Sequence, residues 1–503
     1  MDHTMSDNLD LSHLERDGGT SMTQQLVDRF SAAIETGELG PGDKLPPTRA
    51  LATRAGINHL TAARVYRRLA EEGYVTASVG RGTFVRALAP AAAKVEGDDW
   101  QSYVLPDRPA TYQEDILADA FRFPSQEDMI SLATGWPSPR FHPAAELADI
   151  AARVFAEEGG AAMSYLTAEG LPELREQLAA RGRLSGAATD ADEIIVTSGA
   201  QQAIDLTARA LLQPGEVVAV ESPTFTGTML ALRSTGARII GIPVDEGGLD
   251  VDALEQVLAR HEVQMLALQP GCQNPTGVDL SPERRERLAR LTIDRNLFVM
   301  EDGVYSDLRY EGKPTVSLRR DAPGHVIHVN SLSKVVGGGL RVGWIAARGP
   351  VRDRLATLKQ GTDFHSPTLI QHMASRYLAA GSYDVQLEKS VPYYRERRDA
   401  LMASLERHLA GEYDAAVPRG GHHVWVTLRR PVEERALYSQ AVRHGVAFTP
   451  GGAITAERRQ RTSLRLSFSL VEPDELEEGV KRLARALREV RRRDRTALAA
   501  PLS

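Results

Sequence analysis

Residues 331–344 read Ser331-Leu-Ser-Lys-Val-Val-Gly-Gly-Gly-Leu-Arg-Val-Gly-Trp344. The segment follows the β-rich run 325–330, so Lys334 stands directly after a predicted strand. Glycines 337–339 let backbone or ligand approach closely, because glycine has no side chain. Arg341 adds a planar guanidinium, which suits a phosphate group. We therefore expect a binding site at the end of this strand.

On both sides of this segment the sequence alternates between strand-like and helical runs. Helical runs include 201–212, 251–261 and 282–293, and they separate seven strand-like runs at 193–197, 216–221, 238–244, 263–269, 297–301, 325–330 and 343–347. Such alternation is typical of a mostly parallel sheet with helices on both faces. We therefore predict an α/β fold with a mostly parallel seven-stranded sheet in a large domain over about residues 160–350.

The alternation of strand-like and helical runs ends after residue 350. Long amphipathic helical stretches follow at 371–410 and 474–492. A helical run at 144–157 precedes the large domain. These segments predict a smaller α+β domain formed by about 126–159 together with 351–495. The two domains together would occupy residues 126–495.

Polar side chains follow two other predicted strands. Asp302 ends the run 297–302, and Tyr305 comes three residues later. Asn274 lies in Gln269-Pro-Gly-Cys-Gln-Asn274-Pro-Thr-Gly277, after the strand 263–269. The carboxyl ends of parallel strands line the crevice in which ligands bind, so these side chains are candidate ligand contacts. Turn chemistry alone also explains an acid after a strand and an Asn-Pro pair.

Two strand-to-helix junctions precede these positions. Thr197-Ser-Gly-Ala-Gln-Gln202 leads into a predicted helix, whose first backbone N–H groups suit a phosphate. Phe225 follows the next strand, where its ring could stack on a planar ligand, although a lone phenylalanine is more often a core residue. Arg465 alternates with apolar residues in Thr462-Ser-Leu-Arg-Leu-Ser-Phe-Ser469. A buried arginine there needs an anion, either a ligand carboxylate or an internal salt bridge.

These residue types match what pyridoxal 5'-phosphate (PLP) requires of a protein. A lysine bonds covalently to its aldehyde, an acid keeps its pyridine nitrogen protonated, and a phosphate cup and an aromatic platform hold it. Lys334, Asp302 and Tyr305 are the candidate catalytic residues. The further candidate cofactor contacts are Asn274, Phe225, Ser198, Gly199, Ala200, Gln201, Ser331, Ser333 and Arg341.

The match from about Tyr165 to Arg465 resembles the fold-type I, class I aminotransferases. This resemblance implies that Lys334 bonds to the cofactor, that Asp302 contacts the ring nitrogen and that Arg465 binds the substrate carboxylate. It further implies contacts to the phenolic oxygen from Tyr305 and Asn274, stacking by Phe225, and phosphate binding by Ser198, Gly199, Ala200, Ser331 and Arg341. Tyr165 resembles the tyrosine that reaches the phosphate of the partner subunit, which implies a homodimer.

Residues 21–86 predict three short helices followed by a β-hairpin around Gly80-Arg81-Gly82. Leu26, Phe30 and Ile34 repeat every four residues and form one apolar stripe. The segments 37–52, 61–73 and 80–85 resemble the GntR-type winged helix. In such modules the third helix enters the major groove, while the second helix and the wing contact the backbone.

The resemblance assigns DNA contacts by position to Arg49, Asn58, His59, Thr61, Arg64, Gly80 and Arg81. Arg67 and Arg68 belong either to this surface or to an ordinary solvated face. Ala63 stands where GntR proteins often carry an arginine, so the resemblance does not extend to readout of bases at this position. The expected partner is a double-stranded DNA operator.

Charge is distributed unevenly over the 503 residues, whose net charge is −7. Residues 21–86 contain nine basic and six acidic side chains, a local charge of +3. A basic module on an acidic body fits nucleic-acid contact by one part only, although ordinary scatter also explains so small an excess. We expect residues 1–20 to be a disordered tail and 87–125 to be a linker.

Cys272 is the single cysteine, so neither an intrachain disulfide nor a zinc cluster can form, and no metal site is expected. One cysteine suits the reducing cytoplasm, which is the expected location. The sequence has no run of 18 apolar residues, so we expect no membrane span.

A winged helix, a linker and an aminotransferase-like domain in this order resemble the MocR (GabR-like) subfamily of GntR regulators. That resemblance implies a dimeric, PLP-dependent transcriptional regulator that senses an amine, an amino acid or PLP. Many members carry His-Gln-aromatic-Pro where this chain has Cys272-Gln-Asn-Pro275, an aminotransferase-like choice that favours residual transaminase activity. Two alternatives stay open: an active aminotransferase with an accessory DNA-binding domain, and a DNA-binding module whose aminotransferase fold only dimerises.

Overall fold

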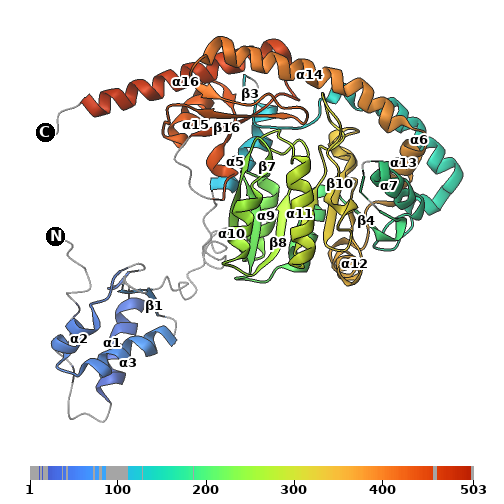
Figure 1. Ribbon diagram of the computed structural model, residues 1–503. Coiled ribbons are helices and arrows are strands. Elements are labelled where there is room, and N and C mark those ends of the chain that lie inside the picture. The colour runs from blue at the N-terminus through green and yellow to red at the C-terminus, as the bar shows by residue number, and fades with distance from the viewer. Residues whose placement is uncertain are drawn as a thin grey trace. The chain divides into compact units, whose positions relative to one another are not determined.

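Two units make up the chain in this computed structural model, Met1–Pro109 and Ala110–Ser503 (Figure 1). The structure describes residues 9, 11, 14, 21–36, 38–40, 43–71, 74–78, 82–85, 112–126, 128–184, 186–187, 189–456 and 462–499. Most of the expected tail, residues 87–111 of the expected linker, and the wing residues Gly80 and Arg81 therefore lie outside the described residues.

The first unit contains the expected three helices and hairpin. Its elements are α1 (Met22–Glu35), α2 (Thr48–Ala55), α3 (His59–Glu71), β1 (Val75–Ser78) and β2 (Gly82–Val85). Its core is the predicted apolar stripe of α1 packed on α3, with Leu26, Phe30 and Val65 at most 1% exposed. Gly56, at a φ of 62°, ends α2 in the left-handed conformation that glycine tolerates, and this starts the turn into α3.

Three leucines ahead of α1 pack on this core. Leu9 is buried, and Leu11 and Leu14 are partly buried against the same cluster. The Leu9 carbonyl accepts a hydrogen bond from Arg54 Nη2 at 2.8 Å. The expectation of a disordered tail is therefore wrong for these three residues, because they supply apolar surface in an otherwise polar stretch.

The second unit is built on an eight-stranded sheet with the order β4-β11-β10-β9-β8-β5-β6-β7. Its strands are β4 (Ile194–Thr197), β5 (Val217–Ser222), β6 (Arg238–Asp245), β7 (Gly248–Leu249), β8 (Val263–Leu268), β9 (Phe298–Asp302), β10 (Val326–Ser331) and β11 (Gly343–Ala346). Neighbouring strands from β6 to β10 are parallel, whereas β11 runs antiparallel to both β10 and β4. The seven expected strands are present, and the two-residue strand β7 extends the edge beyond β6.

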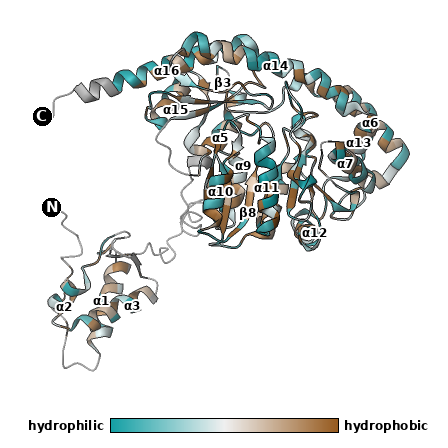
Figure 2. Cartoon of the chain, in the orientation of Figure 1, coloured by the Kyte–Doolittle hydropathy of each residue, from teal (hydrophilic) through white to brown (hydrophobic). Residues whose placement is uncertain are grey.

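Helices cover both faces of this sheet, because successive strand residues point to opposite sides. Val218 packs with Ile204 and Leu355 in one cluster, whereas its neighbour Ala219 packs with Leu254 and Leu288 in another. The helices on the first face are α8 (Ala200–Leu211), α9 (Thr226–Ser234) and α12 (Pro350–Asp363), and those on the second are α10 (Val251–Leu258) and α11 (Pro282–Asp294). Figure 2 shows hydrophobic strands behind the hydrophilic outer surface of α11.

A four-stranded sheet, β12-β13-β16-β15, forms the smaller domain. Its strands are β12 (Tyr413–Asp414), β13 (His423–Leu428), β15 (Thr449–Pro450) and β16 (Ser463–Ser467), and β14 (Val446–Ala447) pairs separately with β3 (Ile130–Ser131). Further helices of the second unit are α6 (Ala144–Glu158), α7 (Pro172–Leu184), α13 (Thr368–Ala379), α14 (Ser382–Leu409), α15 (Glu434–Arg443) and α16 (Pro473–Ala499). Gly381, at a φ of 72°, separates α13 from α14 within the expected run 371–410.

The second half of the expected linker 87–125 belongs to the second unit. Residues Tyr112–Arg122 form helix α5, and a 3₁₀ turn follows at Phe123–Ser125. Ile116 and Phe123 are buried, at 4% and 2% exposure. We expected an extended linker here because the stretch is polar and follows a proline-containing segment, but two apolar anchors suffice to dock a short helix. Among the described residues, no helix is both long and apolar enough to cross a membrane.

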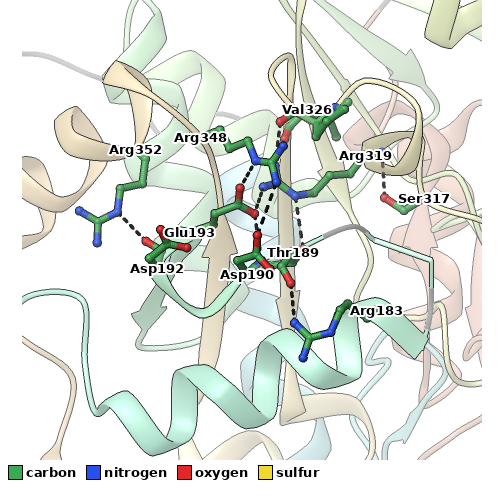
Figure 3. A network of polar contacts seen from close by, with 11 residues as sticks. Arg183, Thr189, Asp190, Asp192, Glu193, Ser317, Arg319, Val326, Arg348 and Arg352 are labelled. Atoms are coloured by element: carbon green, nitrogen blue, oxygen red, sulfur yellow. Dashed lines mark hydrogen bonds and ion pairs between the residues drawn. The ribbon is translucent and has the colours of Figure 1, made fainter.

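Arg319 ties the loop before β10 to the start of β4 (Figure 3). Its side chain is fully buried, and Nη2 donates to Glu193 Oε2 at 2.7 Å while Nη1 donates to the Val326 carbonyl at 2.7 Å. Arg348 also donates to Glu193 from the solvent side. Burial lowers the pKa of Arg319 to about 10, which still leaves the guanidinium charged near neutral pH.

We expect Glu193→Ala to destabilise the protein by about 3–5 kcal/mol, because it leaves Arg319 as a buried charge without its carboxylate. Asp192→Ala removes the exposed carboxylate next to it and should change the free energy of unfolding by less than about 0.5 kcal/mol. Chemical denaturation of both variants measures the difference. Equal denaturation midpoints for the two variants would show that the Arg319 network contributes nothing specific.

Candidate functional site

Lys334 ends the short 3₁₀ turn Leu332–Lys334 that directly follows β10. Its Nζ donates to the Gly135 carbonyl at 3.1 Å and lies 5.2 Å from the centre of the Tyr305 ring. Burial, together with the nearby positive charge of Arg465, lowers the pKa of Lys334 to about 8, although the Asp302 carboxylate acts in the opposite direction. A larger fraction of this amine is therefore neutral and nucleophilic near neutral pH than for an ordinary lysine.

Asp302 is the last residue of β9, and the parallel neighbour of β9 is β10, the strand that leads to Lys334. The side chain is buried, and its Oδ2 accepts a hydrogen bond from Gln269 Nε2 at 2.6 Å. Burial raises the pKa of Asp302, whereas hydrogen bonds from the Val304 N–H and Gln269 lower it. The hydrogen-bond donors to this carboxylate are the neutral Gln269 amide and Val304 N–H, so it can pair with a cationic ring nitrogen.

Gln269 is a site residue that the sequence reasoning missed. Besides its bond to Asp302, its Oε1 accepts a hydrogen bond from the Asn274 N–H at 2.8 Å. Its own backbone N–H donates to Glu221 Oε2 at 2.8 Å, and burial raises the pKa of Glu221 to about 8. Gln269 therefore holds the strand-end acid and the Asn274 turn in one arrangement.

Tyr305 meets a second missed residue, His423. The Tyr305 hydroxyl lies 3.1 Å from His423 Nε2, and His423 Nδ1 lies 2.8 Å from Ser467 Oγ. Burial lowers the pKa of His423 well below its usual value, with a further contribution from Arg465, so the ring is neutral. In the sequence, the consecutive histidines at 422–423 look like part of a core strand. Their contact with Tyr305 becomes visible only in the folded chain.

The predicted phosphate-binding residues meet where β4 leads into α8. Strand register places Ser331 opposite Gly343 and Gly343 opposite Thr197, so the two loops are neighbours. Arg341 Nη2 donates to the Ser198 carbonyl at 2.5 Å. Gly199 has a φ of 91°, and a Cβ there would lie 2.5 Å from Arg341 Nη2, so this position requires glycine.

The neighbouring hydroxyls and amides complete this region. Ser331 Oγ lies 2.8 Å from both Ser333 Oγ and the Val342 carbonyl. Ala200 begins α8, so its backbone N–H belongs to the unpaired first turn. Gln201 is turned elsewhere, because its Nε2 donates to the Gly227 carbonyl at 3.0 Å. Its predicted contact with the cofactor therefore stays a prediction.

Arg465 lies in β16 and closes the other end of the site. Its guanidinium donates to Asn274 Oδ1 at 3.1 Å, to the Ala133 carbonyl at 2.7 Å and to Thr449 Oγ1 at 2.9 Å, and its buried Nε has no partner. No carboxylate of the described residues contacts Arg465, so the structure shows no internal salt bridge for it. Burial lowers its pKa to about 10.

A cavity of about 140 Å³ lies among several of these groups. Its lining includes Lys334, Arg465, Asn274, Tyr305 and the half-buried ring of Phe225. Tyr165 lies apart from it, 88% exposed, with its ring centre 5.4 Å from that of His365. Within one chain the fold therefore brings five of the predicted residues to this cavity, and the roles of the predicted site residues stay predictions.

The arrangement fits PLP. Lys334, Arg341 and Arg465 are cations whose acceptors within the described part of the chain are neutral oxygens, as an anionic ligand requires. Lys334 would hold the aldehyde, Asp302 the ring nitrogen, and the start of α8 with Arg341 the phosphate. When bound, PLP supplies an electron sink for bonds at the carbon that carries the ligand amine.

We expect covalent attachment of PLP to the cofactor-free protein to accelerate as pH rises through about 8. The pKa of Lys334 is lowered to about 8, so its neutral amine accumulates above that pH, whereas an ordinary lysine needs a pH above about 10. Stopped-flow absorbance measures the rate, and Arg465→Gln should move the midpoint upward by removing a nearby positive charge. A rate that keeps rising through pH 10 would contradict the lowered pKa.

The first unit presents a second candidate surface. His59 and Arg64 of α3 and Arg49 of α2 are exposed, whereas Thr61 is half-buried. Asn58 Oδ1 accepts a hydrogen bond from the Thr61 N–H at 2.8 Å, so this side chain caps α3 rather than extending freely. Contact between these residues and DNA stays a prediction.

Two family models match the chain, one for each unit. The model for bacterial regulatory proteins of the gntR family matches residues 22–85, and the model for aminotransferase class I and II matches residues 127–483. The solved structure of a multiple substrate aminotransferase from Thermococcus profundus is similar to the second part, with a TM-score of 0.72 and 31% identity over 78% of this chain and 99% of that chain.

Two curated relatives share both parts. The uncharacterized HTH-type transcriptional regulator YisV of Bacillus subtilis is 30% identical over 94% of this chain and 97% of its own length. The probable rhizopine catabolism regulatory protein MocR of Rhizobium meliloti is 26% identical over 94% and 95%, respectively. The chain therefore belongs to the MocR group of gntR-family regulators, in which a winged helix is fused to a PLP-dependent domain of the class I and II aminotransferase family.

Proposed function

We propose that this protein is a transcriptional regulator that binds an operator through its winged helix and senses an amino acid or amine at Lys334. The observation that carries this proposal is the presence, in one chain, of a gntR-type module and an assembled PLP site. An enzyme that only transaminates has no use for a DNA-binding unit, whereas a sensor needs both parts.

The sensing step follows from competition at one position. An amine ligand competes with Lys334 for the same covalent bond, and displacement leaves the Lys334 amine free beside Tyr305 and the Gly135 carbonyl. A ligand changes DNA binding only if it binds two states of the protein with different affinities. Residues 86–111 connect the winged helix to helix α5 in the sequence. They are the covalent link between the ligand site and the DNA-binding module.

We further infer a homodimer with shared sites. Tyr165 and Phe364 are 88% and 67% exposed and line one surface cavity of about 750 Å³. Large exposed apolar rings in one place are typical of an interface, and Tyr165 resembles the residue that reaches a partner's phosphate. A symmetric dimer would also present two winged helices to two half-sites of an operator.

The experiment that tests this function is DNA footprinting of the full-length protein with and without PLP, across a panel of amino acids and amines. We expect a defined protected sequence whose occupancy or pattern changes with at least one amine, only when PLP is present. Protection that is identical in all conditions would contradict a PLP-dependent sensor.

A second candidate function is a working aminotransferase. Asn274 favours it, because its side chain lies in the cavity and accepts a hydrogen bond from Arg465, whereas many MocR proteins carry an aromatic residue there. Repeated turnover with an amino acid and a keto acid would support this candidate. A single stoichiometric conversion, or none, would leave the regulator as the function.

We expect Arg64→Ala to weaken binding to the operator by about 1–3 kcal/mol, or roughly 5- to 150-fold. Arg64 is an exposed side chain on α3, the helix expected to enter the major groove. Arg29→Ala removes the same charge from α1, where Arg29 pairs with Glu38, and should cost only a few-fold. Fluorescence anisotropy with labelled DNA measures both; equal losses would mean that only net charge matters.

A further inference from the structure

Part of the lining of the ligand cavity is apolar, and most of that part comes from helix α5. Ile116, Leu117, Ala120 and Phe121 of α5 line the cavity together with Trp136. The rings of Phe121 and Trp136 contact each other at a tilt of 58°, with their centres 5.4 Å apart. They remain 61% and 39% exposed, so a ligand packed against them would remove further aromatic surface from water.

Charge restricts what this cavity accepts. Among the described residues that line it, the charged side chains are Lys334 and Arg465, and both are cations. The Lys334 amine that the ligand displaces stays beside Tyr305 and the Gly135 carbonyl, and burial lowers its pKa, so Arg465 is the cation that remains for one carboxylate. No acid of this lining is available for a second ligand ammonium, and no further cation for a second carboxylate. His423 does not change this count, because burial keeps its ring neutral.

Helix α5 is held in place at the side of this cavity. Asp119 Oδ2 accepts a hydrogen bond from the Tyr438 hydroxyl at 2.8 Å, and the Ala120 carbonyl accepts one from Thr134 Oγ1 at 2.8 Å. Ile116 packs on Ala453 and Ile454. Figure 1 shows α5 between α9 of the large domain and α15 of the small domain. The apolar wall is therefore a built part of the site.

We propose that the ligand is an amino acid with one carboxylate and an uncharged apolar or aromatic side chain, and that this side chain packs against Phe121 and Trp136. This inference rests on the proposed function and names the ligand class for that site. Helix α5 starts at Tyr112, directly after residues 86–111. Such a ligand would thus contact the element at which the chain enters the second unit, whereas glycine or alanine would not reach it.

The test uses the full-length, PLP-loaded protein and follows cofactor absorbance during titration with five amino acids. The probes are L-phenylalanine, L-leucine, L-alanine, L-glutamate and L-lysine. We expect L-phenylalanine or L-leucine to reach half-saturation at a concentration at least about tenfold below those of L-glutamate and L-lysine. Tighter binding of either charged amino acid would overturn the proposed ligand class.

The variant Phe121→Ala tests the role of α5. It should raise the half-saturating concentration of L-phenylalanine about tenfold relative to that of L-alanine, because only the larger side chain contacts the removed ring. Ile293→Ala, which shortens another partly exposed apolar side chain on α11, should leave this ratio unchanged. An unchanged ratio in Phe121→Ala would overturn the contact with α5.

DNA binding measured in the same titrations separates this inference from the proposed function. If the amino acids rank as expected by absorbance but none alters operator binding, the regulator proposal fails and the ligand class stands. If operator binding responds but the charged amino acids bind more tightly, the ligand class fails and the regulator stands.

Discussion

Lys334→Ala is expected to abolish the response of operator binding to amino acids while leaving operator affinity itself nearly unchanged. The side chain sits in the second unit, after β10, so its loss removes the covalent link to PLP without altering the winged helix. The variant should also lose the absorbance of the lysine-bound cofactor. Fluorescence anisotropy with operator DNA, with and without ligand, measures the response.

Two controls make this result specific. Lys313→Ala removes an exposed lysine from a loop of the same unit and should retain both the absorbance and the response. Circular dichroism and the denaturation midpoint of Lys334→Ala show whether the variant is folded. A folded Lys334→Ala protein that still responds normally to amino acids would place the switch outside this site.

Arg465→Gln is expected to weaken binding of an amino acid by about 2–3 kcal/mol, or roughly 30- to 150-fold. Hydrogen bonds to charged groups contribute about 1.5–3 kcal/mol each, and an arginine–carboxylate pair can make two. Arg465 is buried and its Nε has no partner, so a ligand carboxylate would meet a donor that is already in place. Absorbance titration of the PLP-loaded protein measures this affinity.

The matched comparison for Arg465→Gln is a ligand that lacks the carboxylate. Phenylethylamine has the side chain and amine of phenylalanine, so its affinity should change far less than that of the amino acid. Arg465→Lys keeps the charge but not the planar pair of donors, and should fall between the native protein and Arg465→Gln. Equal losses for the amino acid and the amine would show that Arg465 supports the fold rather than the carboxylate.

The sequence located most of the site because parallel strands place their carboxyl ends at one edge of a sheet. Asp302 ends β9 and Lys334 follows β10, which is its parallel neighbour. The positions of these residues at strand ends were therefore enough to predict that they lie close together. The core of the first unit could also be predicted from the sequence, because it is one apolar stripe of α1 packed on α3.

Other parts depend on contacts that the sequence pattern does not encode. His423 reaches Tyr305 only because the small-domain sheet lies against the large domain, and a histidine in a β-rich run looks like a core residue. Helix α5 is short, and its docking relies on distant partners such as Tyr438 and Ile454. Its position as a wall of the ligand cavity could therefore not be predicted from residues 112–122 alone.

The central claim is that PLP is held covalently by Lys334. Borohydride reduction of the PLP-loaded, full-length protein, followed by digestion and mass spectrometry, tests it most directly. The account predicts a pyridoxyl mass on the peptide that contains Lys334. A label confined to other lysines, or no label on any peptide, would contradict it.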